Sequence, residues 1–276
     1  MENLLHTKSQ VYAPLVRNSA GAESDLTKLR IAILEAASVA KEGHVPSALS
    51  ILNILYCIFL EDLKDFDLEP RDFSFILSKG HASLGLYAVL AKAKFFSEDW
   101  INEFGRFNSD FGGHPDRNKV NGVLASTGSL GHGLPMGVGI SLALKARGSK
   151  ETVIVLIGDG ELNEGSNWES LLIAHHHALS NLIVIIDQNQ SSERAIKMEF
   201  LLEKFNAFGM QTSEIDGHDH QQIISTLFSN ESKTPKVIIA NTTKGYGVPE
   251  MENNPAWHHA SPTAEQFLVF VNELQK

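Results

Sequence analysis

The segment that decides the fold is VIVLIGDGELNEG, Val153 to Gly165, in which an aliphatic run leads directly into Gly158-Asp159-Gly160. The run is too short for a buried helix and ends in turn-forming glycines, so it indicates a buried strand. Glycine on each side of Asp159 lets the backbone approach a ligand closely and is expected to expose both glycine amides, while the carboxylate projects from the strand end. The pattern therefore predicts a site for a diphosphate and its metal ion.

The next aliphatic run, LIVIIDQNQSSE from Leu182 to Glu193, contains Asn189 about thirty residues after Asp159. That distance fits one strand-and-helix unit, so the two runs are predicted to be neighbouring parallel strands. Adjacent strands would then present a carboxylate and an amide oxygen side by side at one edge of the sheet. These are hard oxygen ligands suited to Mg²⁺ or Ca²⁺, with the phosphates of a ligand completing the coordination shell.

Other short apolar runs, bounded mostly by turn residues, extend this sheet. From Asp25 onward, Leu26, Leu29 and Ile33 recur at helical spacing, with Asp25 as the expected cap and Gly43 as the end of a first helix. Helical segments separate the apolar runs, and this alternation predicts a doubly wound α/β fold, with a mainly parallel sheet and helices on both faces. The predicted strands are Phe73 to Leu77, Thr152 to Ile157, Leu182 to Ile186 and Val237 to Ala240.

The chain is predicted to consist of an N-terminal arm and one domain. Residues 1–24 show no clear period, whereas no repeat, low-complexity tract or linker divides residues 25–276. A second, more apolar helix is predicted from Ser47 to Leu60. Ligands of doubly wound folds bind beyond the carboxyl ends of the strands, which is where the predicted metal site lies.

The composition excludes several classes of partner. The chain has 276 residues, of which 23 are Lys or Arg and 33 are Asp or Glu, and its formal net charge is −10. No run is rich in Lys and Arg, which argues against nucleic acid or an anionic membrane as the main partner. No apolar stretch approaches the roughly 20 residues of a membrane span, and the start lacks a signal-peptide pattern. The single cysteine, Cys57, excludes a disulfide framework and a cysteine-based zinc site within one chain, so a cytoplasmic location is expected.

Further polar motifs follow one another along the chain. They are Gly43-His44, Ser78-Lys79-Gly80-His81, Gly113-His114-Pro115, Ser126 to Gly131, Gly158-Asp159-Gly160-Glu161 with Glu164-Gly165, Asp216-Gly217-His218-Asp219, and Thr243-Lys244-Gly245 followed by Trp257-His258. GDG followed after about thirty residues by Asn is the thiamin diphosphate motif. With the other blocks in this order, the chain resembles the amino-terminal, diphosphate-binding half of transketolase from about Leu26 to His258.

The resemblance implies how the cofactor and its metal are held. Asp159 and Asn189 should ligate Mg²⁺ (or Ca²⁺) through their side chains, with the backbone carbonyl of Ser191 as a third ligand. Lys244 should add positive charge near the diphosphate. The residues expected to contact thiamin diphosphate are His81, Gly128, Leu130, Gly158, Gly160, Glu161, Asn189, Lys244 and His258.

The resemblance also implies catalytic roles. His44, His81, His114 and His258 should surround the reacting carbon, where imidazoles can move protons to and from the hydroxyls of a ketose at neutral pH. Glu164 resembles the acid through which the family couples its two active sites. The consecutive histidines from His175 to His177 point in different directions on a predicted helix, so no shared metal is expected there. His218 and His220 are assigned no chemistry, because DGHD is expected to cap a helix.

In the family, the glutamate that activates the cofactor and the groups that bind substrate phosphate come from a second domain of another subunit. Because the chain ends at Lys276, it resembles the amino-terminal subunit of a split transketolase. It is expected to transfer a two-carbon ketol unit from a ketose (phosphate) to an aldose, and to be inert without a C-terminal, pyrimidine-binding subunit. Self-association into a heterotetramer is expected through an apolar face on residues 128–144 and 164–178.

Some positions depart from the family pattern and leave alternatives open. Pro46, Ser47, His132 and His259 differ where substrate should lie, and the segment from Gln190 to Glu193 is polar where the family places aliphatic residues. The sugar and its pathway therefore stay open. The alternatives are a subunit of a pyruvate-using thiamin diphosphate synthase and a non-catalytic partner subunit. A nucleotide-binding oxidoreductase ranks last, because no G-x-G-x-x-G follows the first strand.

Overall fold

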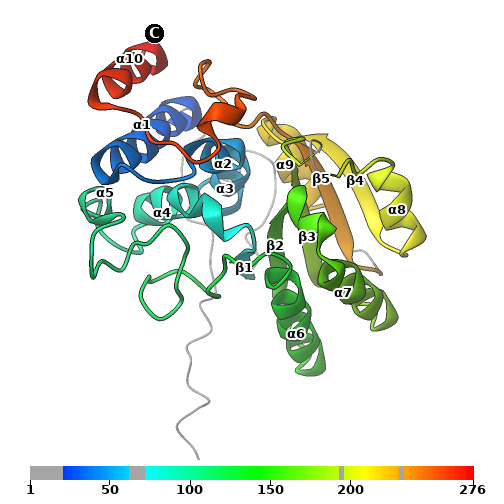
Figure 1. The fold of residues 1–276 in the computed structure, drawn as a ribbon. Coiled ribbons are helices and arrows are strands. Elements are labelled where there is room, and N and C mark those ends of the chain that lie inside the picture. The colour runs from blue at the N-terminus through cyan, green and yellow to red at the C-terminus, as the bar shows by residue number, and fades with distance from the viewer. Residues whose placement is uncertain (1–20, 62–71, 193–195, 230–232) are drawn as a thin grey trace, which may run out of the picture.

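The computed structural model is a parallel five-stranded sheet covered by helices on both faces (Figure 1). It describes residues 21–61, 72–192, 196–229 and 233–276, so most of the predicted N-terminal arm lies outside the described residues. The strand order is β1-β2-β3-β5-β4, and all neighbours are parallel. The strands are β1 (Phe73–Leu77), β2 (Thr152–Gly158), β3 (Leu182–Gln188), β4 (Gln211–Asp216) and β5 (Lys236–Asn241).

The two faces of the sheet belong to two separate apolar cores. In β2, Ile154 and Leu156 face one core, whereas Val153, Val155 and Ile157 face the other. This alternation follows from the period of two in a strand, and both sets are buried because helices cover both faces. The predicted doubly wound α/β fold is confirmed.

The helices divide between these cores (Figure 1). On one face lie α1 (Ala22–Ala40), α2 (Val45–Ser50), α3 (Leu52–Phe59), α4 (Ser83–Lys92), α5 (Trp100–Glu103), α9 (His220–Leu227) and α10 (Ala264–Leu274). On the other face lie α6 (Gly133–Ala146), α7 (Gly165–His176) and α8 (Leu201–Ala207). Short 3₁₀ turns η3 (Gly80–Ala82), η4 (Gly160–Asn163) and η5 (Pro255–Trp257) follow strand ends or loops. No helix in the described ranges is both long and apolar enough to cross a membrane.

The strand β4 was not predicted from the sequence. Its residues QTSEID are mostly polar, and only Ile215 is buried. The strand lies at the edge of the sheet and pairs only with β5, so most of its side chains meet solvent rather than a core. A search for apolar runs misses such an edge strand.

The predicted ends of the first helix were wrong. Helix α1 begins at Ala22, and Asp25 does not cap it, because the carboxylate of Asp25 instead pairs with the Lys92 ammonium at 2.7 Å. The helix ends at Ala40, where Lys41 adopts a left-handed conformation and its amide bonds the Ala37 carbonyl. Gly43 lies beyond this end.

The predicted helix from Ser47 to Leu60 consists of two helices. Helix α2 begins earlier, at Val45, and the break from α3 falls at Ile51. The hydroxyl of Ser50 donates to the Ser47 carbonyl at 3.0 Å and to Asp187 at 2.9 Å. Such a bond from a side chain to a carbonyl three residues earlier competes with the regular helical bond.

Two glycines of α6 provide a matched test of how this helix packs. A Cβ at Gly137 would lie 2.4 Å from Cγ2 of buried Val155 in β2, whereas a Cβ at Gly139 would meet nothing within 4 Å. Gly137→Ala should therefore lower the free energy of unfolding by about 1–3 kcal/mol through overpacking. Gly139→Ala should raise it by about 0.5–1 kcal/mol, because alanine loses less backbone entropy in a helix. Equal effects in urea titrations would contradict this packing.

Candidate active site

The predicted metal ligands lie together at the carboxyl ends of β2 and β3. Asp159 follows β2 and Asn189 follows β3, and both are buried. Ser191 lies between them, since its amide donates to Asn189 Oδ1 at 3.1 Å and its hydroxyl to Asp159 Oδ1 at 3.5 Å. The structure thus brings a carboxylate and an amide oxygen together, which are donor types that hard divalent cations prefer, with the Ser191 loop beside them.

A buried ion pair fixes the orientation of one of these predicted metal ligands, Asn189. The ammonium of Lys79 contacts Asp187 Oδ2, and both side chains are almost completely buried. Asn189 donates to the same oxygen at 2.7 Å, which fixes the direction of its amide. Burial alone would raise the pKa of Asp187, but the charge of Lys79 and the hydrogen bonds to the carboxylate hold it below its usual range. Asp187 was not singled out in the sequence, although an acid inside an aliphatic strand requires a buried partner.

Glu161 turns inward and holds a neighbouring loop. Its carboxylate accepts from Gly131 N at 2.9 Å, from Gly158 N at 3.3 Å and from the Ser78 hydroxyl. Burial raises the pKa of Glu161, whereas these donors oppose the shift. In this geometry, Glu161 positions the turn before α6.

One expectation about this edge needs correction. The glycine amides are not both exposed, because Gly158 N donates to Glu161 and Gly160 N donates to Asp159 Oδ1 at 2.7 Å. The polar loop also has an unusual backbone, since Gln190 adopts φ 61°, a left-handed conformation that costs a non-glycine residue about 1–2 kcal/mol. Glu193 of this loop lies outside the described residues.

Three of the four predicted catalytic histidines form one cluster, together with one that was not predicted. The ring of His44 lies 5.3 Å from that of His81 and 5.7 Å from that of His258, measured between ring centroids. The unpredicted ring is that of His259, only 4.4 Å from His44. His44 precedes α2, His81 follows β1 and His258 follows η5, so three distant segments supply the cluster.

His114 reaches the same region through the turn that contains Gly128. A Cβ at Gly128 would lie 2.8 Å from Cδ2 of His114, so the ring packs directly on this glycine. Gly128 also has φ 153°, which L side chains rarely adopt. A Cβ at Gly80 would lie 2.7 Å from the Thr127 carbonyl. Two loops therefore touch backbone to backbone between His81 and His114, and glycine is required at both positions.

Leu130 and Glu164 frame the turn before α6. Leu130 is half-buried, and its carbonyl lies 3.0 Å from His132 Nδ1. Glu164 is exposed at the start of α7 and packs against Gly131, where a Cβ would lie 2.6 Å from Cβ of Glu164. Gly131 has φ 77°, so the turn needs glycine for both its space and its conformation.

Lys244 brings positive charge to the cluster. Its ammonium lies 3.0 Å from His258 Nδ1, and the residue is 8% exposed. Burial and the charge of Lys79 lower the pKa of Lys244 to about 8, against the opposing effects of Asp187 and Asp159. Among the described residues, no carboxylate lies within 4.0 Å of this ammonium.

The inner histidines are neutral at physiological pH in this structure. Burial, followed by the charges of Lys79 and other neighbours, lowers the pKa of His81 to about 2. Burial and the neighbouring histidines lower the pKa of His44 to about 4, and burial and Lys244 also lower the pKa of His258. Proton transfer by His44 and His81 at neutral pH therefore requires a nearby negative charge that raises these pKa values.

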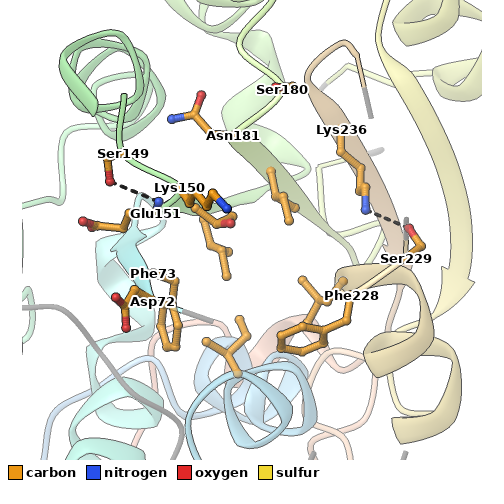
Figure 2. A pocket seen from close by; sticks show the side chains of 15 residues that line it. Asp72, Phe73, Ser149, Lys150, Glu151, Ser180, Asn181, Phe228, Ser229 and Lys236 are labelled. Carbon is orange, nitrogen blue, oxygen red and sulfur yellow. Dashed lines mark hydrogen bonds between the residues drawn. The ribbon is translucent and has the colours of Figure 1, made fainter. Parts of the chain in front are cut away.

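A separate cavity of about 540 Å³ lies at the opposite ends of the strands (Figure 2). Phe73, Glu151 and Lys236 line it, close to the amino ends of β1, β2 and β5. None of the predicted site residues borders this cavity. The predicted chemistry therefore belongs to the carboxyl edge of the sheet and not to this cavity.

Comparisons with known proteins agree with this geometry. The profile of the family described as "Transketolase, thiamine diphosphate binding domain" matches residues 22–269. A protein of Actinobacillus succinogenes, named as one of the subunits of an apulose-4-phosphate transketolase, is 40% identical over 256 residues, which cover 89% of this chain and 92% of that protein. The chain belongs to the transketolase family.

Other transketolase relatives show how the chain aligns with longer proteins. Human transketolase is 35% identical over 240 residues, which cover 84% of this chain but 38% of the human protein. The crystal structure of Campylobacter jejuni transketolase superposes with a TM-score of 0.82 at 27% identity, covering 93% of this chain and 43% of that chain. Residues 22–269, which include all five strands of the sheet, thus correspond to the thiamin diphosphate-binding domain of transketolases.

The lowered pKa values of the histidines predict how stability depends on pH. Below about pH 6.5 the unfolded imidazole of His81 takes up a proton, but the folded one does not, so acidification favours unfolding. His81→Asn should therefore reduce the loss of unfolding free energy between about pH 7.5 and about pH 5, relative to the unmodified chain. His44→Asn should do so to nearly the same extent, because a folded pKa of about 4 also keeps the His44 imidazole unprotonated down to about pH 5. Denaturant titrations with an unchanged or steeper pH dependence in His81→Asn would contradict this account.

Proposed function

We propose that this chain is the thiamin diphosphate-binding subunit of a two-chain transketolase, which transfers a two-carbon ketol unit from a ketose or ketose phosphate to an aldose. The observation behind the proposal is a convergence at one sheet edge. Oxygen donors from Asp159 and Asn189 lie there beside two buried lysines, Lys79 and Lys244. The histidine cluster lies at the same edge. A divalent cation would bind the oxygen donors, and a diphosphate would bind the cation, the lysines and the histidines.

The charges of the described residues fit a diphosphate. Lys244 is largely buried, its pKa is lowered, and the ion pairs of the described chain give it no carboxylate partner. An anionic group beside it would raise this pKa again and accept charge-assisted hydrogen bonds from the ammonium. His81 and His258, with lowered pKa values, would serve as further donors to the same anion.

The donor set at Asp159 fits Mg²⁺ (or Ca²⁺). The proposed ligands are the Asp159 carboxylate, the Asn189 amide oxygen and the backbone carbonyl of Ser191, all of them hard oxygens. Asn189 Nδ2 donates to Asp187, which leaves Oδ1 of the amide turned toward Ser191 and the proposed metal. Gly128, Leu130, Gly158 and Gly160 remain the proposed backbone contacts of the cofactor.

The proposed mechanism divides between the cofactor and this chain. When bound, thiamin diphosphate supplies the nucleophilic carbon and stores the electron pair released when a carbon–carbon bond breaks. His44, His81, His114 and His258 orient the sugar hydroxyls and exchange protons with them. The negative diphosphate would raise the pKa values of His81 and His258 toward the range in which imidazole works as an acid and a base.

Exposed apolar side chains on two neighbouring helices support the proposal that the domain binds other subunits. Met136 on α6 and Leu172 and Ile173 on α7 are large apolar side chains that are exposed in the described chain. They lie on the two helices that follow the cofactor loops, where self-association and pairing with a pyrimidine-binding subunit are proposed to bury them. Glu164 directly precedes α7, so a link between two active sites through this acid would cross the same interface.

The names of relatives guide the choice of substrate. Two relatives, 40% and 36% identical, are named as subunits of apulose-4-phosphate transketolases, and one that is 33% identical is named as a component of a 6-deoxy-6-sulfo-D-fructose transketolase. We therefore propose a ketose with a terminal anionic group as the donor, and apulose 4-phosphate as the first sugar to test. The lone, buried Cys57 fits a reducing compartment, and a cytoplasmic location is proposed.

Reconstitution tests the proposed function. The chain alone should show no ketol transfer, because no partner surface is present to grip the aminopyrimidine. Mixing it with a separately expressed pyrimidine-binding transketolase chain from the same genome should give a heteromeric complex on sizing. That complex should consume apulose 4-phosphate in a reaction that requires thiamin diphosphate and Mg²⁺.

The controls separate this function from its alternatives. Asp159→Ala should form the same complex but bind thiamin diphosphate at least about 100-fold more weakly in calorimetry, because the metal loses its carboxylate ligand. Turnover by the purified chain alone, checked for partner by mass spectrometry, would contradict the two-chain proposal. Release of CO₂ from pyruvate by the complex would favour the synthase, and a complex that binds no cofactor would favour a non-catalytic role.

A further inference from the structure

Three side chains that commonly bind metals meet where α3 and α9 pack together. Cys57 and Glu61 come from the end of α3 and the residues after it, and His220 is the first residue of α9. One ligand atom from each side chain can be chosen so that all three lie within 4.8 Å of one another. Among the described residues, this is the one such group of three His, Cys, Asp or Glu side chains.

One oxygen of the Glu61 carboxylate, Oε2, forms an ion pair with His220 but accepts no hydrogen bond in the described chain. Glu61 is 3% exposed, and its Oε2 is fully buried but accepts no hydrogen bond. Nδ1 of His220 lies only 2.7 Å from this oxygen, yet the two do not form an aligned hydrogen bond. A buried carboxylate oxygen without a hydrogen bond is costly, and a shared cation would satisfy it together with the imidazole nitrogen.

A second buried oxygen nearby also lacks a hydrogen bond. Asn53, one turn before Cys57 on α3, has a buried Oδ1 without a partner, while its Nδ2 lies 3.2 Å from Nε2 of His220. If Nδ1 of His220 binds a metal, Nε2 carries the proton and needs an acceptor. A half-turn of the Asn53 amide would supply Oδ1 as that acceptor, at the cost of the 3.3 Å contact between Nδ2 and the His218 carbonyl.

The local charge favours a cation. The carboxylates of Glu61 and Asp219 both lie close enough to Cys57 to act on it electrostatically. These negative groups attract a divalent ion. His220 is the one ion-pair partner of Glu61 within the described chain, so no lysine or arginine there occupies the position.

We propose that Cys57, Glu61 and His220 bind one Zn²⁺ ion. A thiolate, an imidazole and a carboxylate are all zinc ligands, and three protein ligands leave a fourth, tetrahedral position for water. On binding, Zn²⁺ displaces the thiol proton of Cys57 to solvent and bonds to the sulfur, while the neutral imidazole and the ionised carboxylate donate electron pairs. No oxidation or reduction takes place. The His220 side chain is 20% exposed and offers the route of entry.

The expectation that one cysteine excludes a zinc site thus holds for sites built from several thiolates but not for this mixed set. The soft thiolate also distinguishes the proposed site from the all-oxygen ligands at Asp159 and Asn189, which suit Mg²⁺. The proposed ion would link α3 to the start of α9, near the segment that contains Thr243 and Lys244. His218, two residues before His220, accepts a hydrogen bond from Thr243 N at 2.8 Å, directly beside Lys244.

Metal titration of the full chain, without thiamin diphosphate or Mg²⁺, tests this proposal. After treatment with a chelator, the chain should bind one equivalent of Zn²⁺, and Co²⁺ should give the near-ultraviolet absorption of a cobalt–thiolate bond. Cys57→Ser and His220→Gln should each weaken Zn²⁺ binding by more than the roughly 10–100-fold that the loss of an outer partner of a metal ligand costs. Asp159→Ala and His176→Gln should bind Zn²⁺ as the unmodified chain does.

Three outcomes would overturn the proposal. They are the absence of stoichiometric Zn²⁺ binding, binding that survives both Cys57→Ser and His220→Gln, and binding that is lost in His176→Gln, which would assign the ion to the exposed histidines at the end of α7. If Cys57→Ser fails to fold, the Co²⁺ spectrum of the unmodified chain decides, because only Cys57 can supply a thiolate. A Co²⁺ spectrum without the thiolate absorption would then contradict the proposed site.

Discussion

The buried ion pair between Lys79 and Asp187 is the interaction on which the proposed active site depends. Removing both charges from water is expensive, and the pair is tolerable only because the carboxylate has further donors. Ser50 donates at 2.9 Å and Asn189 at 2.7 Å, and the Thr242 hydroxyl contacts the other carboxylate oxygen. Three segments that are distant in sequence thus converge on the Asp187 carboxylate, together with Asn189 from the end of its own strand, so that their positions depend on one another.

Each of these segments leads to a different part of the site. Lys79 precedes His81, Ser50 ends the helix that follows His44, and Asn189 is itself a proposed metal ligand. Thr242 lies two residues before Lys244, the proposed partner of the diphosphate. The ion pair therefore fixes the oxygen donors relative to the histidine cluster, where the proposed ligand is a diphosphate.

Much of this arrangement could be predicted because it rests on local patterns. The aliphatic runs before Gly158 and Asn189 mark central parallel strands, and the order of the strand ends then places Asp159 beside Asn189. Other features depend on tertiary surroundings that no local pattern reports. The polar strand β4 is defined by its position at the sheet edge, and the neutral state of His81 follows from its burial beside Lys79. Asp187 gave a signal, as an acid within an aliphatic strand, but its partner Lys79 lies more than a hundred residues away.

A double-mutant cycle on the isolated chain tests the central role of this ion pair most directly. Denaturant titrations would compare Lys79→Met, Asp187→Asn and the double variant with the unmodified chain. Each single variant is expected to lose about 3–5 kcal/mol of unfolding free energy, because Lys79→Met leaves an unpaired buried carboxylate and Asp187→Asn an unpaired buried ammonium. The double variant should lose clearly less than the sum of the two, since neither charge then remains. Additive losses, or single variants as stable as the unmodified chain, would contradict the view that this pair holds the site together.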